Sequence, residues 1–174
     1  ATRDEYWKHG SVSEDFARIE CPVYAVSGWA DAYADTVPRL LAGLRTPCKG
    51  LVGPWAHLYP HEATPAPAIG FLQEAKRWWD EWLRGIDTGI RHEPAYRVWM
   101  QDHPRSTPAR HSAPHRTGRW VAEEVWPSGR IEVTTHVLPA TAMPAIGPAG
   151  AANGVAVPPG ARQSIGLAAG PWCA

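Results

Sequence analysis

Cysteine is scarce in this chain of 174 residues and is not arranged for its usual structural roles. The three cysteines, Cys21, Cys48 and Cys173, form no C-x-x-C motif and lie at no metal-ligand spacing from a histidine. A disulfide framework needs paired cysteines and a zinc site needs closely spaced ligands, so neither is indicated. We therefore expect a reducing or neutral compartment, with the cytoplasm as the default, and no metal or cofactor.

An excess of charge of one sign is also missing, because 17 basic residues balance 17 acidic ones. The chain therefore lacks the basic footprint typical of proteins that bind nucleic acid or an anionic membrane. No apolar run reaches the roughly 18 to 20 residues that cross a bilayer, and the N-terminus has no signal-peptide core. The expected partner is a small, uncharged or weakly charged molecule, and a homo-oligomer stays open.

Apolar residues are plentiful, at 44% of the chain, which is enough for a packed core. Ten tryptophans stand against two phenylalanines. Tryptophan suits positions where a large ring needs one hydrogen-bonded edge, so half-buried packing and binding clefts are both candidates. The missing initiator methionine and the apolar ending GPWCA predict a segment of a longer protein.

The stretch from Pro22 to His57 has the pattern of a strand, a helix and a second strand. A short apolar run over residues 21–27 predicts a strand buried on both faces. Asp35 is a candidate cap for the helix that follows, and residues 49–52 predict the second strand.

A strand, helix and strand of this length predict a right-handed crossover between parallel strands. The carboxyl ends of parallel strands lie at the same edge of a sheet, where open α/β sheets bind their ligands. Asp31 follows the first strand and His57 follows the second. We therefore expect these two side chains to face one crevice.

The clearest periodic element is a predicted helix over residues 71–83. Asp80 and Arg84 can pair at i, i+4, and Gly85 is a natural stop. Charged residues occupy one face, whereas the other carries an apolar stripe of Phe71, Leu72, Ala75, Trp78, Trp79, Trp82 and Leu83. This stripe predicts core packing against the last strands of the sheet rather than a ligand platform.

The residue pattern of the sequence changes after Glu93. Residues 94–100 predict a strand, and residues 101–119 predict a connector rich in proline and histidine. Two short strands are expected at 120–125 and 131–138, and residues 139–159 predict a long loop. The shift in composition predicts a domain boundary at about residues 105 to 118.

Several motifs, taken in order, resemble the CocE/NonD family of α/β-hydrolases, which includes cocaine esterase, glutaryl-cephalosporin acylases and Xaa-Pro dipeptidyl-peptidases. They are the pair Tyr6-Trp7, CPVYAVSGWAD, KGLVGPWAH, RWWDEWLRG, the EP-x-x-R-V segment and the closing GLAAGPWCA. The resemblance implies an α/β fold. Residues 1–110 would be the C-terminal part of the catalytic domain, and residues 111–174 the beginning of an incomplete β-sandwich (jelly-roll) domain.

The same resemblance implies a Ser-His-Asp triad with Asp31 as the acid and His57 as the base. An imidazole activates a serine hydroxyl by taking its proton, and a carboxylate orients the imidazole and stabilises its cation. In α/β-hydrolases the serine precedes the acid, yet no G-x-S-x-G motif precedes Asp31 or occurs elsewhere. We expect a C-terminal fragment that lacks its nucleophile and oxyanion hole and is inactive alone.

Trp29, Tyr33 and Trp55 flank the two predicted catalytic residues, either as packing under the loops or as walls of the acyl pocket. α-Amino-acid ester hydrolases of this group carry acidic residues two and three positions after the acid. This chain has Tyr33 and Ala34 there, which favours the esterase branch.

The leading hypothesis is a serine hydrolase that cleaves ester or amide bonds through an acyl-enzyme. Peptidase and esterase activities share the triad, so the substrate stays open at this point. The alternative is a non-catalytic, β-rich binding module or a degenerate pseudo-enzyme. A histidine pair with an acid, His57, His61 and Glu62, is disfavoured as a metal site because Pro60 breaks any helix that would align them.

Overall fold

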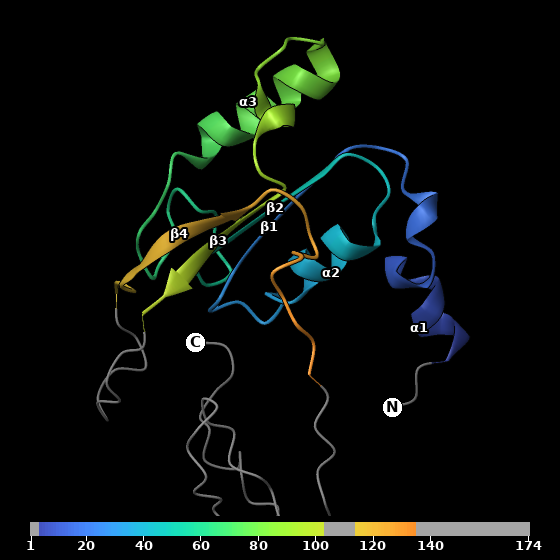
Figure 1. The fold of residues 1–174 in the computed structure, drawn as a ribbon, viewed down its shortest axis with the longest axis horizontal. Coiled ribbons are helices and arrows are strands. Elements are labelled where there is room, and N and C mark those ends of the chain that lie inside the picture. Colours follow the sequence, from blue (N-terminus) through green and yellow to red (C-terminus); the bar gives the residue numbers. More distant parts are fainter. Residues whose placement is uncertain (1–3, 103–113, 135–174) are drawn as a thin grey trace, which may run out of the picture. The chain divides into compact units, whose positions relative to one another are not determined.

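The computed structural model describes residues 4–102 and 114–134 of the chain. The described residues up to Arg130 lie in one compact unit. In these described ranges no helix is long and apolar enough to cross a membrane. The elements, seen in Figure 1, are α1 (Glu5–His9), η1 (Val12–Glu14), η2 (Phe16–Arg18), β1 (Val23–Gly28), α2 (Thr36–Gly43), β2 (Cys48–Gly53), α3 (Phe71–Arg84), η3 (Ile90–His92), β3 (Tyr96–Gln101) and β4 (Gly118–Glu123).

The four strands form one mixed sheet in the order β1-β2-β3-β4. β1 and β2 pair in parallel along their whole length, from Val23 opposite Cys48 to Gly28 opposite Gly53. β3 pairs with β2 in parallel, whereas β4 is antiparallel to β3. The predicted parallel crossover between the first two strands is therefore confirmed. An α/β fold follows, because β1 and β2 are joined through α2.

β4 forms close to the predicted strand at 120–125, and it extends the sheet that β1, β2 and β3 build. Residues 131–134 have no regular secondary structure, so the strand predicted at 131–138 is wrong over these four positions. Its remaining residues, the predicted loop at 139–159 and the closing GLAAGPWCA lie outside the described ranges. The jelly-roll domain and its boundary stay predictions.

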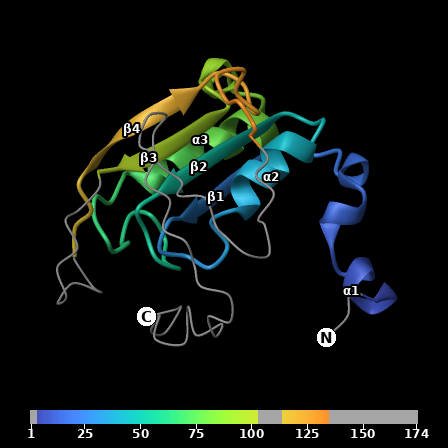
Figure 2. The same cartoon turned by 60° about the horizontal axis from the view of Figure 1, so that its bottom comes forward.

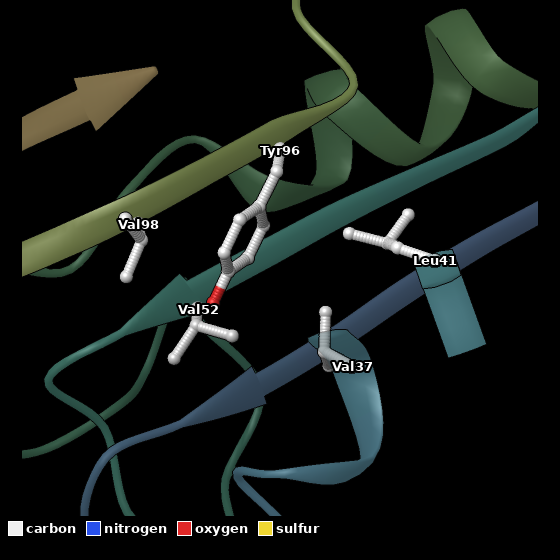
Figure 3. Packing of buried hydrophobic residues seen from close by; sticks show 5 residues of the cluster. All are labelled: Val37, Leu41, Val52, Tyr96 and Val98. Carbon is white, nitrogen blue, oxygen red and sulfur yellow. The ribbon is translucent and has the colours of Figure 1, made fainter. Parts of the chain in front are cut away.

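The two faces of the sheet carry separate hydrophobic clusters. On one face, Val37 and Leu41 of α2 pack against Val52, Tyr96 and Val98 (Figure 3). On the other face, a second cluster consists of Leu51, Trp55 and Ala63, with Tyr24, Val26 and Ile69 packed against it. Leu51 and Val52 therefore point to opposite faces, as consecutive strand residues do. Figure 2 shows α2 and α3 on opposite sides of the sheet.

α2 begins next to Asp35, as predicted, but the carboxylate makes no capping hydrogen bond. It lies instead 3.5 Å from Nη1 of Arg39, on the exposed surface. The N-terminal residues contribute α1 and two short 3₁₀ helices, none of which has a buried residue. The predicted capping interaction is therefore absent, and the helix depends on the burial of Val37 and Leu41.

α3 has the predicted extent, ends at Gly85 in the left-handed conformation (φ 65°), and carries the predicted ion pair between Arg84 and Asp80 at 2.8 Å. Its apolar stripe is not uniformly buried, however. Trp78 is buried, whereas Trp79 is 54% exposed and Leu83 is 73% exposed. The prediction that the whole stripe packs in the core is therefore wrong, because the sheet covers only the side of the helix that carries Trp78.

Candidate active site

The loops that follow β1 and β2 lie against each other at the carboxyl edge of the sheet. The backbone N–H of Trp29 donates to the carbonyl of Gly53 at 2.8 Å, and that of Ala30 donates to the carbonyl of Trp55 at 3.0 Å. These two bonds continue the parallel pairing of β1 and β2 beyond the last strand residues. They place Asp31 and His57 within reach of each other, as the strand pattern predicts.

Close approach of the two loops requires glycine at the ends of both strands. A Cβ on Gly28 would lie 2.0 Å from the carbonyl oxygen of Trp55, and a Cβ on Gly53 would lie 2.3 Å from the indole of Trp55. Real Cβ atoms essentially never approach other atoms so closely. Glycine at these positions therefore makes room for Trp55, which is 1% exposed and forms the floor between the loops.

Asp31 and His57 form a hydrogen-bonded pair, with 2.8 Å between Oδ2 of the acid and Nδ1 of the imidazole. The backbone N–H of Tyr33 donates to the other carboxylate oxygen of Asp31 at 3.0 Å. The Asp31 side chain is 10% exposed, whereas that of His57 is 82% exposed. A carboxylate at Nδ1 fixes the imidazole tautomer and leaves Nε2 accessible to a further group.

A cavity of about 480 Å³ opens beside this pair. Apolar and aromatic side chains supply most of its wall, as in many small-molecule sites. Its lining comprises Val26, Ser27, Asp31, Trp55, Ala56, His57, Leu58, Tyr59, Pro60, Glu62 and Phe71. Sequence reasoning missed Phe71 here, since its helical spacing indicated core packing.

Ser27 is the one serine among the described residues that line this cavity, but its position does not suit a nucleophile. Its Oγ is buried and has no hydrogen-bond partner among residues 4–102 and 114–134. A nucleophilic serine should instead be bonded to the base or presented to it at an exposed turn.

The three predicted pocket residues have different surroundings. Trp55 lines the cavity, and its indole N–H donates to the carbonyl of Pro67 at 2.8 Å. Tyr33 is exposed, with its ring centroid 6.1 Å from that of His57. Trp29 does not line this cavity, and its indole N–H donates to the carbonyl of Trp99 at 2.7 Å.

Metal-binding groups are not gathered near the pair. His61 stacks against Phe71, and its Nε2 lies 3.7 Å from Glu62. Across the part of the chain that the structure describes, no three or more histidine, cysteine, aspartate or glutamate side chains cluster as metal ligands would. The arrangement around His57 is suited to proton transfer, since it joins a shielded carboxylate to an accessible imidazole.

Together, the parallel strands and the hydrogen-bonded Asp31 and His57 at their carboxyl edge define an α/β protein with a candidate acid and base pair. Residues 1–59 match the family model described as X-Pro dipeptidyl-peptidase (S15 family). Among solved structures, the chain is similar to two crystal structures of a CocE/NonD family hydrolase from Staphylococcus aureus, each with a TM-score of 0.55 and 14% identity. A search of curated proteins gave no match.

The family-model match and the structural similarity support a CocE/NonD-type family, as the sequence motifs predict. The matched residues 1–59 of this chain include both Asp31 and His57. The two structural matches cover 79% of this chain and 22% of the Staphylococcus aureus protein. The chain thus spans about a fifth of the length of the solved structures it matches.

Proposed function

We propose that this chain supplies the acid and the base of a serine hydrolase that cleaves ester or amide bonds. In this proposal Asp31 orients His57, and the serine comes from polypeptide that precedes residue 1. The observation that carries the proposal is the 2.8 Å contact between Oδ2 of Asp31 and Nδ1 of His57, with the rest of the imidazole exposed.

The reaction would follow the usual acyl-transfer sequence. Nε2 of His57 takes the serine proton as Oγ bonds to the acyl carbon, and the imidazolium then protonates the departing alcohol or amine. Water repeats these steps on the acyl-enzyme and regenerates the free serine. Asp31 keeps its charge throughout and stabilises the imidazolium. Its shielded position and the hydrogen bond from the Tyr33 N–H hold the carboxylate in place for this role.

Among the described strands β1 lies at an edge of the sheet, and the character of this edge supports a serine outside the sequence. β1 contains no charged residue between Val23 and Gly28, although exposed edge strands are usually protected by charges. β4, at the opposite edge, carries Arg119 and Glu123. Packing covers β1 on both faces, because Ala25 meets one hydrophobic cluster and Val26 meets the other. A strand of this kind is typical of a sheet interior, so a further strand beside β1 would present the serine at the same edge.

The domain arrangement of the full-length protein also belongs to this proposal. A β-sandwich of the jelly-roll type would begin within residues 111–174, as the closing GLAAGPWCA suggests. The substrate would be a small ester or amide, with its acyl or leaving group in the apolar cavity beside His57. Tyr33 and Ala34 favour the esterase branch over hydrolases of α-amino-acid esters.

The experiment is steady-state kinetics on the full-length parent with a simple aryl ester. Asp31→Asn and His57→Ala should each lower kcat by roughly 10⁴-fold, since each removes a member of the triad. Asp35→Asn serves as the matched control, because this exposed carboxylate lies on α2 and contacts Arg39. If either triad variant retained most of its kcat, the assignment of acid and base would be wrong.

A further inference from the structure

Trp29 makes a hydrogen bond that spans the end of the central strand. It directly follows β1, yet its indole N–H donates to the carbonyl of Trp99 in β3 at 2.7 Å. β2 lies between these two strands in the sheet. The indole therefore crosses the carboxyl end of β2. It joins the loop that follows β1 and carries Asp31, here called the acid loop, to β3, which is not adjacent to β1 in the sheet.

The carbonyl of Trp99 lies where the parallel ladder stops. The register of β2 with β3 ends at Val52 opposite Val98, one residue before Trp99. The ring of Trp99 in turn packs edge-on against Trp120 of β4, with 5.3 Å between centroids. The indole of Trp29 thus bonds a backbone acceptor held in a paired and packed strand, which makes β3 a firm anchor.

The indole bond of Trp29 attaches the acid loop to β3, whereas the backbone bonds of the same loop attach it elsewhere. The backbone N–H groups of Trp29 and Ala30 attach the loop to β2 and its following loop. Asp31 comes two residues after Trp29, so rotation of this segment would move the carboxylate away from Nδ1 of His57. A hydrogen bond on the far side of β2 resists that rotation.

From these contacts we propose that Trp29 is a positioning residue, which fixes the acid loop on β3 so that Asp31 meets His57. The proposal rests on the proposed function. It departs from the expectation that Trp29 is a wall of the acyl pocket, because Trp29 does not line the cavity that holds Asp31 and His57. Its bonded edge faces β3 instead.

The test is Trp29→Phe in the full-length parent, assayed with an aryl ester. Phenylalanine keeps an aromatic ring but removes the N–H donor. We expect kcat to fall about 10- to 100-fold, since small misplacements of catalytic groups cost rates of this order, with KM within about twofold. Trp7→Phe is the matched control, because Trp7 is exposed on α1, and it should leave both constants unchanged.

A double-mutant cycle with Asp31→Asn separates positioning from a general structural effect. If Trp29 acts through Asp31, Trp29→Phe should cause little further loss once the acid is gone. Equal losses in both backgrounds would overturn the proposal, as would a raised KM with unchanged kcat, which indicates a pocket wall. Unchanged kinetics in Trp29→Phe would also overturn it.

Two controls keep the outcome interpretable. Replacement of Trp29 by benzothienylalanine preserves the shape of the indole without its N–H, and it should reproduce the loss of kcat even if the phenylalanine variant folds poorly. Asp31→Asn and His57→Ala in the same assay test the proposed function itself. If they lose activity while the Trp29 variants do not, the positioning role fails and the triad assignment stands.

Discussion

At the scale of single residues, the candidate site depends on two glycines without side chains as well as on the acid and the base. Gly28 and Gly53 end their strands where Trp55 needs the space, so neither can carry a side chain without displacing a loop. Asp31 is shielded and bonded at both carboxylate oxygens, whereas His57 is exposed. The reactive geometry therefore rests on close backbone packing behind the acid and base.

Gly28→Ala should be strongly destabilising. The new Cβ would lie 2.0 Å from the carbonyl oxygen of Trp55, so backbone must move, and we expect a loss of about 2 to 4 kcal/mol in the free energy of unfolding. Urea unfolding of this chain measures it. Gly129→Ala is the control, because its Cβ would meet nothing within 4 Å and should change stability by less than about 0.5 kcal/mol. Equal effects at both positions would contradict the steric argument.

At the scale of elements, α3 is held to the sheet by a polar network as well as by packing. Arg97 of β3 donates to Glu74 of α3 and to the hydroxyl of Tyr24 in β1, both at 2.7 Å. Burial raises the pKa of Tyr24 to about 12. Burial would also raise the pKa of Glu74, but the hydrogen bonds and charge of Arg97 outweigh it and lower that pKa overall. These contacts fix the helix whose first residue, Phe71, lines the cavity.

Glu74→Gln should weaken the attachment of α3 in a pH-dependent way. Because the pKa of Glu74 is lowered in the folded state, its stabilisation is present above the unfolded value of about 4.3. It is lost as the pH falls through the folded pKa. We expect the variant to lose about 1 to 3 kcal/mol near pH 7 and to approach the parent chain in acid.

Thermal or urea unfolding across this pH range measures the difference between the two chains. Glu62→Gln is the control, since that side chain is 73% exposed and its carboxylate lies 3.7 Å from Nε2 of His61. A stability difference that stayed constant down to pH 2 would show that the charge of Glu74 is not the stabilising feature.

At the scale of the whole molecule, the described unit carries apolar surface at one edge of its sheet and on α3. Within the described part of the chain, β1 leaves an uncharged strand edge unpaired, and α3 exposes Leu72, Trp79 and Leu83. Small proteins seldom leave apolar surfaces of this kind open. The solved structures that the chain matches are several times longer than the matched part. These features agree with the proposal that the nucleophile lies elsewhere in the polypeptide.

A fluorophosphonate probe should label the full-length parent at one serine and leave this chain unlabelled. The probe reacts with serines that a neighbouring base activates, and the proposal places that serine before residue 1. Gel fluorescence and peptide mapping locate the label. The parent with His57→Ala should lose most of its labelling, and labelling of the isolated chain at Ser27 or another serine would contradict the proposal.

The sequence by itself determined the local elements and the meeting of acid and base. The strand, helix and strand between Pro22 and His57 predict parallel strands, and parallel strands bring the residues after their carboxyl ends to one edge. The sequence alone therefore brings Asp31 and His57 to the same edge of the sheet. The extent of α3 and its end at Gly85 also follow from local periodicity and backbone conformation.

Tertiary structure alone decided which partners those elements meet. The bond from Trp29 to Trp99 joins residues 70 positions apart, and the pairing of β4 with β3 adds an antiparallel strand across a connector without periodicity. Trp78 and Trp79 are neighbours on one predicted stripe, yet one is buried and the other exposed. Periodicity describes which side chains share a face, whereas burial depends on what packs against that face, and this is set by distant parts of the chain.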